Sequence, residues 1–143
     1  MTGIDGAEAV RRLEGRGYRA TPQRLSVLAA LAARPTHVTA QDLHADLRAS
    51  GERLGLATVY RTLELLAQCD LAARFPQPNN EVCYVYCSAR HHHHLVCTGC
   101  GRVAEIPGCA LQPVQQDIER AHDFTITGHT LTFFGTCASC SSQ

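Results

Sequence analysis

Two pairs of cysteines in this 143-residue sequence have the spacing of metal ligands. They are Cys97-x-x-Cys100 and Cys137-x-x-Cys140, and each pair lies in a stretch of small residues. A CxxC turn can place two thiolates on one ion, and four thiolates complete the tetrahedral site of structural zinc. Two redox-active dithiols or two disulfides are the alternatives. We predict one zinc ion shared by all four cysteines, which would fasten the last strand to the middle of its domain.

A run of four histidines, residues 91–94, precedes the first cysteine pair. If the run begins a strand, His91 and His93 face one way while His92 and His94 face the other. Within a pair the backbone positions are about 7 Å apart, so both rings can reach one ion. Imidazole suits zinc and similar metals, although a solvated polar loop is the alternative. We therefore predict two further metal sites, whose remaining ligands come from Cys83, Cys87, His37, His122, His129, Glu81 and Glu105.

The composition excludes several classes of protein. With 45% apolar and 18% charged residues the chain is expected to fold. It has neither an apolar run of the roughly 18 residues that span a membrane nor the apolar region of a secretory signal. We therefore expect a cytoplasmic protein without a membrane partner, in which eight cysteines are more consistent with metal ligands than with disulfides.

Charge and motifs also bear on function. Net charge is zero, but residues 1–80 hold ten arginines against eight acids, which is compatible with nucleic-acid binding. A catalytic zinc needs an open coordination position and a general base, and the H-x-E and P-C-x-x-C signature of zinc deaminases is absent. We predict that the protein is not an enzyme and has no small-molecule substrate.

The secondary structure expected to position these residues differs between the first and second halves of the chain. Residues 1–70 have helical periodicity. One helix ends at Gly15, one starts at N-cap Thr21 and stops at Pro35, one runs from N-cap Thr39 to Gly51, and one lies in GLATVYRTLELLAQCD. Two short strands around a Pro/Asn turn follow, and helices followed by such a hairpin are typical of a winged helix.

The second half has a different pattern. Residues 92–106 predict two strands joined at the cysteine-rich turn, residues 110–122 an amphipathic helix, and FTITGHTLTFFGTC a further strand. The expected fold class is α+β. A winged-helix DNA-binding domain over residues 1–86 is followed by a small α/β domain over residues 87–143 that carries the four-cysteine zinc site.

The sequence resembles the ferric uptake regulator family of metal-sensing repressors. The matching segments are TPQRLSVL, HVTAQDLHADL, GLATVYRTLELL, HHHHLVCTGCG and FGTCASC, in that order and over nearly the whole chain. The segment CSARHHHHLVC is most similar to the zinc uptake regulator branch. The resemblance implies a homodimer whose metal-loaded form binds double-stranded operator DNA and represses uptake genes, with residues 87–143 as the dimerisation domain.

The resemblance also implies ligand sets. Cys97, Cys100, Cys137 and Cys140 match the structural zinc site, in agreement with their spacing. The regulatory site near the interdomain hinge is matched by Cys87, His92 and His94, and the second site of the dimerisation domain by His91, His93 and His129. Zinc is the implied metal of the structural and regulatory sites, although Mn²⁺ or Fe²⁺ could occupy the latter.

Two positions depart from the family pattern. The acidic regulatory ligand of the zinc branch is expected fourteen residues before Cys87, where this chain has Ala73, which cannot bind metal. We predict His37 as the replacement, because it matches a regulatory histidine of other branches. The second site usually takes a glutamate from the following helix, where this chain has Gln112. Gln112 would be a weaker ligand, with Glu105, another group or water as alternatives.

The resemblance places DNA contacts on the last helix before the hairpin. Tyr60 and Arg61 match the family's recognition-helix contacts, and Arg24 and Arg19 are expected to bind phosphate near a helix N-terminus. The predicted function is a zinc-dependent transcriptional repressor of metal homeostasis genes. The alternatives are a sensor of iron, manganese or peroxide within the family, or a thiol redox switch that uses Cys69, Cys83 or Cys109.

Overall fold

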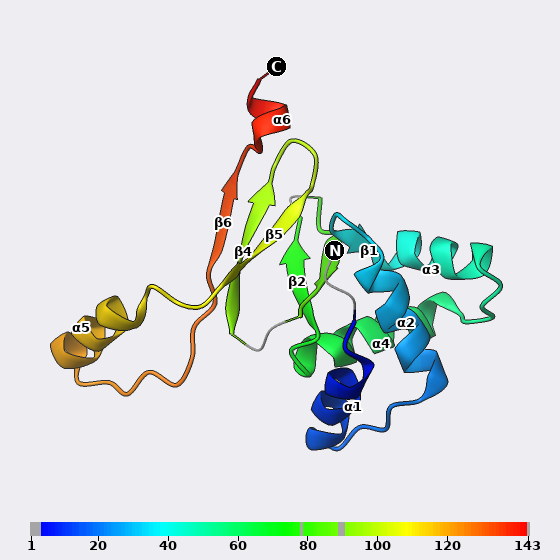
Figure 1. Ribbon diagram of the computed structural model, residues 1–143, viewed down its shortest axis with the longest axis horizontal. Helices are drawn as coiled ribbons and strands as arrows, with labels where there is room; N and C mark the ends of the chain where they lie inside the picture. The colour runs from blue at the N-terminus through cyan, green and yellow to red at the C-terminus, as the bar shows by residue number, and fades with distance from the viewer. Residues whose placement is uncertain (1–3, 78, 89–90, 143) are drawn as a thin grey trace. The chain divides into compact units, whose positions relative to one another are not determined.

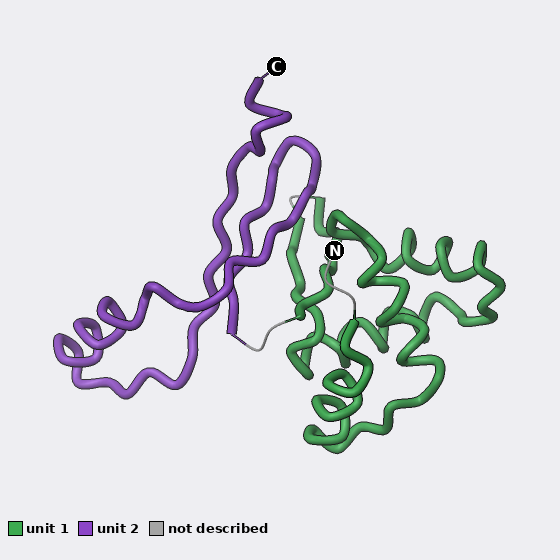
Figure 2. The backbone as a smooth tube through the Cα atoms, viewed as in Figure 1, with its two compact units in different colours: residues 1–90 green, residues 91–143 purple. Residues whose placement is uncertain are grey.

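The computed structural model describes residues 4–77, 79–88 and 91–142 and divides into two compact units. The first unit comprises residues 1–90 and the second residues 91–143 (Figure 2). The boundary therefore falls four residues after the predicted one. Among the described residues, no helix combines the length and the apolar character needed to cross a bilayer.

Four helices dominate the first unit (Figure 1): α1 (Gly6–Gly15), α2 (Pro22–Ala32), α3 (Ala40–Ala49) and α4 (Leu56–Gln68). Both predicted N-caps are present. The hydroxyl of Thr21 accepts a hydrogen bond from Arg24 N at 3.2 Å, and that of Thr39 accepts one from Asp42 N at 3.1 Å. Gly51 follows α3 with a φ of +92°, a left-handed conformation that glycine adopts without steric cost. Local capping thus sets where α2 and α3 begin and where α3 ends.

A small antiparallel sheet completes the first unit. Its strands are β1 (Val38–Thr39), β2 (Ala72–Pro76) and β3 (Val82–Tyr86), in the order β1-β3-β2. The predicted hairpin is β2 and β3, whereas the short β1 had no clear sequence signal. Fully buried leucines and valines from the helices pack with Tyr84 of β3 in one core. Helices α3 and α4 followed by this hairpin form the expected winged-helix arrangement.

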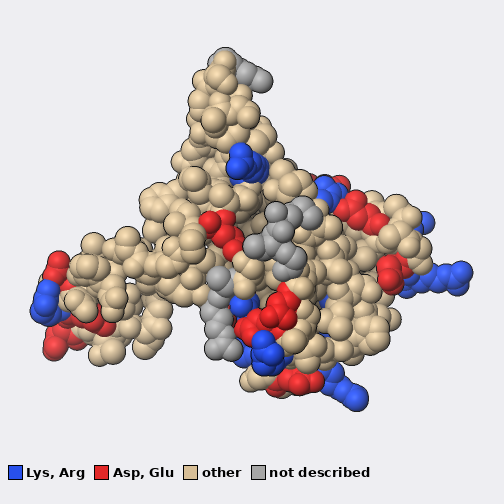
Figure 3. All heavy atoms as spheres, in the orientation of Figure 1, with Lys and Arg blue, Asp and Glu red and all other residues tan. Residues whose placement is uncertain are grey.

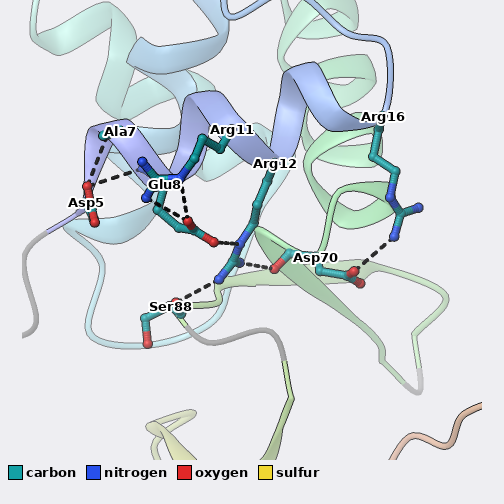
Figure 4. A network of polar contacts seen from close by, with 8 residues as sticks. All are labelled: Asp5, Ala7, Glu8, Arg11, Arg12, Arg16, Asp70 and Ser88. Carbon is teal, nitrogen blue, oxygen red and sulfur yellow. Dashed lines mark hydrogen bonds and ion pairs between the residues drawn. The ribbon is translucent and has the colours of Figure 1, made fainter.

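A buried arginine fastens α1 to the rest of the first unit (Figure 4). Arg12 donates through Nε to Glu8 at 3.0 Å. Its terminal nitrogens donate to the carbonyl oxygens of Asp70 at 2.8 Å and of Ser88 at 3.0 Å. Because a buried guanidinium is costly without partners, these contacts fix the chain at the C-terminal end of α4 and immediately after Cys87.

The second unit is built on a mixed three-stranded sheet. Strand β4 (His92–Cys97) lies between antiparallel β5 (Val103–Pro107) and parallel β6 (Thr132–Gly135). Helix α5 (Gln112–His122) connects β5 to β6, and the short α6 (Ala138–Ser141) follows at the opposite end of the sheet (Figure 1). This is the predicted α/β order.

The last strand is shorter than the alternating pattern from Phe124 onwards predicted. Only Thr132–Gly135 is strand, and residues 124–131 are irregular. Residue pairing explains the difference. Thr132 pairs with His94 near the start of β4, so the preceding segment extends beyond that strand and has no neighbour to complete a ladder.

Candidate metal centres

Four cysteine thiols meet at one end of the second sheet. Cys97 ends β4, Cys100 lies in the following turn, Cys137 is the N-cap of α6, and Cys140 lies within α6. Their four sulfur atoms lie within 4.8 Å of one another. The Cys100 and Cys137 sulfurs are 3.8 Å apart, which equals the edge of about 3.8 Å expected for a tetrahedron with Zn–S bonds of about 2.3 Å. The cluster therefore has the dimensions of a closed zinc site.

Backbone geometry prepares this cluster to carry negative charge. The backbone N–H groups of Cys137, Cys100 and Gly99 lower the pKa of Cys97 to about 6, with that of Cys137 contributing most. Hydrogen bonds with Cys137 and then Cys97 raise the pKa of Cys140 to about 12. The peptide dipoles thus stabilise one thiolate, whereas a full set needs the charge of a cation.

The turn also requires a glycine. A Cβ atom on Gly99 would lie 2.9 Å from the sulfur of Cys140, closer than such atoms normally approach. Glycine at this position lets the backbone of the Cys97–Cys100 turn approach the second pair of thiols.

A second cluster lies on β4 and β5. The Nε2 atoms of His92 and His94 are 3.1 Å apart, and Glu105 Oε1 is 3.9 Å from His92 Nε2. Glu105 is here because it pairs directly with His94 in the β4–β5 register. Two ring nitrogens this close can share only one proton, whereas a metal ion would accept both lone pairs. The tetrahedral edge for zinc–nitrogen bonds of about 2.05 Å is about 3.3 Å, close to the observed separation.

Burial favours the neutral form of His94 and of His93. It lowers the pKa of His94 to about 4, with the neighbouring His92 adding to the effect. Burial, followed by the charges of His129 and His91, also lowers the pKa of His93. The Nδ1 atoms of His92 and His93 are buried without a hydrogen-bond partner in the described part of the chain. Neutral imidazole is the form that binds metal.

The other two histidines of the run belong to a third cluster. The His91 ring lies 5.1 Å from that of His93 and 5.0 Å from that of His129, between ring centroids. The fourth member is Cys109, whose sulfur is 3.4 Å from His93 Nε2 and 3.3 Å from His129 Nε2. The two pairs of the run thus lie in separate clusters, as the alternation predicted.

One of the expected second-site ligands lies elsewhere, because Glu105 is grouped with His92 and His94 rather than with His91 and His93. Gln112 is exposed at the start of α5, and its role as a ligand stays a prediction. The sequence pattern indicates Cys109 only as a candidate redox thiol, not as a metal ligand. No spacing rule identifies it, because Pro107 ends β5 and only the β4–β5 register brings the next residues beside His93.

The remaining predicted ligands, Cys87 and His37, belong to the first unit. Cys87 is buried just after β3, where its backbone N–H donates to Leu71 O at 3.0 Å. His37 is half-buried immediately before β1. Cys69 and Cys83 are also buried in this unit, and burial is the largest cause that raises the pKa of each thiol. The thiolate is the reactive form, so these two cysteines are poorly suited to redox chemistry.

The expected DNA contacts lie on or near exposed helix surfaces. Tyr60 and Arg61 project from α4, while Val59 and Leu63 on its opposite side are fully buried. Tyr60 is 45% exposed, so it is not a core residue. Arg19 is exposed just before α2, and its carbonyl oxygen accepts a hydrogen bond from Arg24 Nη1 at 2.7 Å. Arg24 thus also orders the backbone that leads into α2.

The chain has extensive similarity to known proteins. It is 37% identical over 126 residues to the zinc uptake regulation protein of Mycobacterium tuberculosis (strain CDC 1551 / Oshkosh), covering 88% of this chain and 97% of the relative. It is 36% identical over 137 residues to the ferric uptake regulation protein of Bacillus subtilis (strain 168), covering 93% and 92%. A solved structure of a zinc uptake regulator complexed with zinc and DNA aligns with a TM-score of 0.74 at 26% identity, covering 95% of this chain and 92% of that one.

Residues 15–134 match the sequence model of the ferric uptake regulator family. The matched span includes the winged helix, the histidine run and the first cysteine pair. The fold and the ligand clusters agree with this match, and the resemblance expected from the sequence motifs is confirmed. The chain belongs to the ferric uptake regulator family.

Proposed function

We propose that this protein is a zinc-dependent transcriptional repressor that binds operator DNA as a homodimer and controls genes of metal homeostasis. Membership of the family supports regulation rather than enzymatic activity. The similarity to zinc uptake regulators, one of them complexed with zinc and DNA, supports zinc as the signal and DNA as the partner.

The regulatory site is proposed to contain His92, His94, Glu105 and Cys87. The observation that carries this proposal is the pair of Nε2 atoms 3.1 Å apart beside a carboxylate. Cys87 precedes His92 by only five residues, a span short enough for its sulfur to reach the same ion. One sulfur, two imidazoles and one carboxylate make a suitable zinc set. His37 is the alternative to Glu105 as the fourth ligand.

Such a site would act as a switch because its ligands come from both sides of the unit boundary at residues 90 and 91. Holding Cys87 and the histidine pair on one ion would restrict the short connection between the units. Arg12 contributes by fixing the carbonyl oxygen of Ser88, the residue after Cys87. In the metal-free state the DNA-competent arrangement would be rare, and the apparent affinity for DNA would fall with its population.

Recognition is assigned to α4. Arg61 can read guanine edges in the major groove, and Tyr60 can contact a phosphate or a thymine methyl group. Arg19 and Arg24, near the N-terminus of α2, are proposed to contact the DNA backbone. Two copies of this helix in a dimer would meet successive half-sites of one operator.

The dimer is supported by the apolar surface of the second unit. Six of the eight exposed large apolar side chains recorded for the described residues lie there: Leu95, Val114, Ile118, Phe124, Phe133 and Phe134. No charged residue occurs between residues 124 and 143, and little charge covers the strands and α6 in Figure 3. An exposed apolar surface of this kind is typical of a subunit interface.

Zinc-dependent DNA binding provides the test. Duplexes selected from a random pool with zinc-loaded protein serve as the probe, and chelated protein is titrated with Zn²⁺, Mn²⁺ or Fe²⁺. We expect Zn²⁺ to restore binding. His92→Ala should stay folded, retain the four-cysteine zinc and lose the response, whereas His122→Ala, which changes an exposed histidine outside the clusters, should respond normally.

The same titration distinguishes the rival functions. Restoration by Mn²⁺ or Fe²⁺ alone would contradict zinc sensing and favour an iron or manganese regulator. A normal zinc response in His92→Ala would contradict the assignment of the regulatory site. Loss of DNA binding after mild peroxide treatment, with all metals retained, would instead favour a thiol redox switch.

A further inference from the structure

Helix α5 has an unusual attachment to its own unit. None of its residues is buried, and its apolar Val114 and Ile118 are 52% and 46% exposed. The less exposed side of the helix carries Gln115 and Glu119, four residues apart. Glu119 Oε1 accepts a hydrogen bond from Ile126 N at 2.7 Å. Burial of apolar surface, which normally fixes a helix on a sheet, therefore contributes little to holding α5.

The third cluster lies at the base of this helix. Cys109 is three residues before α5 begins, and its sulfur contacts the Nε2 atoms of His93 and His129. The contact distances of 3.4 and 3.3 Å approach the nitrogen–sulfur edge of about 3.5 Å expected in a tetrahedral zinc site. The ligand atoms of His91, His93, His129 and Cys109 all lie within 4.8 Å of one another. Four donors of the right types are therefore already assembled.

Helix α5 also supplies a residue that orients one of these donors. The ring nitrogen Nδ1 of His129 is 3.0 Å from Gln115 Oε1. An amide oxygen can only accept, so Nδ1 carries the proton and Nε2 presents its lone pair towards Cys109. A partner of this kind on the second ring nitrogen is what metal-binding histidines usually have. Gln115 is thus a positioning residue for the site.

We propose that Cys109 is the fourth ligand of the second metal site, and that this site fastens α5 so that Val114 and Ile118 are presented to the partner subunit. The inference rests on the proposed function for the dimer. The thiol of Cys109 releases its proton when it binds Zn²⁺, and the sulfur and His93 then join the start of α5 to strand β4. A site of one sulfur and three nitrogens is closed to other ligands, as expected for a structural role.

The test uses full-length protein loaded with Zn²⁺. Zinc content per chain, hydrogen exchange of residues 112–122 and the dimer dissociation constant are measured for each variant. Cys109→Ala should lose one zinc, lose protection in α5 and dimerise more weakly, whereas Cys109→Asp, which restores a ligand, should recover the zinc. Gln115→Leu should weaken the same zinc by about 10- to 100-fold, as loss of an orienting partner typically does. Cys69→Ala, a change to a buried first-unit thiol, is the control.

A full zinc content together with a protected α5 in Cys109→Ala would overturn the proposal. So would an unchanged zinc affinity in Gln115→Leu, a variant that keeps all four ligands and guards against misfolding as the explanation. DNA binding by the wild-type protein is measured in parallel. If zinc fails to restore DNA binding to the chelated wild type, the proposed function is contradicted. The zinc content and the protection of α5 would still test the role of Cys109 independently.

Discussion

The two units of this protein are stabilised by different means. The first has a core of fully buried aliphatic side chains contributed by α1 to α4 and the small sheet. In the described part of the second, only Val96, Cys97, His93 and His94 are buried, and two of these four are histidines. Three clusters of potential metal ligands draw most of their residues from this unit.

The difference follows from size and composition. A unit of about fifty residues buries too little apolar surface to offset the entropy of ordering its chain, and metal sites or partner subunits commonly supply the deficit. We propose that the second unit uses both devices, because its potential ligands are clustered and its phenylalanines are exposed. On this proposal the first unit folds by burial alone, whereas folding of the second unit is coupled to what it binds.

Removal of zinc should give the largest difference between the two units. Removing zinc with a strong chelator at pH 7 removes a contribution on the order of 10 kcal/mol to the second unit. We expect amide protection to be lost in β4, β5 and β6 and retained in α2, α3 and α4, measured by hydrogen exchange with mass spectrometry. Protein treated with chelator and excess zinc is the control. Persistent protection of β4 in the chelated protein would mean that the second unit folds without metal.

A core truncation in the first unit should give an intermediate effect. Leu63→Ala on α4 empties a fully buried position and should lower the free energy of unfolding by about 2–5 kcal/mol, measured by urea denaturation. Leu56→Ala on the same helix changes a 41% exposed leucine and should alter stability by less than about 0.5 kcal/mol. Both variants should keep their zinc content. Zinc loss in Leu63→Ala alone would show that the second unit depends on the core of the first.

The reactivity of the cysteine thiols should show the smallest difference between the units, and it is confined to single residues. Burial raises the pKa of Cys69 and of Cys83 above the usual 9.0. Because the folded pKa exceeds the unfolded one, their contribution to stability is intact below pH 9 and is lost as pH rises through the raised values. At pH 8, iodoacetamide should leave both unmodified in native protein even after chelation.

Three cysteines of the proposed zinc cluster, Cys100, Cys137 and Cys140, are not buried and should behave differently in the same labelling experiment. Once the protein is chelated, they should be alkylated rapidly, as measured by peptide mass mapping, because the proposed ion rather than burial protects them. Equal labelling of Cys69 and Cys100 in chelated protein would contradict a difference between the units.

Much of the architecture could be predicted from local patterns. The N-caps at Thr21 and Thr39 and the left-handed Gly51 depend on residues a few positions apart, and each is found where it was expected. The arrangement of each CxxC pair is also set locally, because a tight turn places its two sulfur atoms close together. The division of the histidine run follows from the alternation of side chains along a strand.

The allocation of the remaining donors depended on tertiary structure. The register of β4 against β5 pairs Glu105 with His94, so this carboxylate joins a different histidine pair from the one expected. The same register and the irregular segment before β6 bring Cys109 to His129, twenty positions apart in the chain. The sequence by itself determined the types of ligand and the alternation within the run, because those are local. Only the folded chain decided which donors lie close together, because strand register and loop path are set by long-range packing.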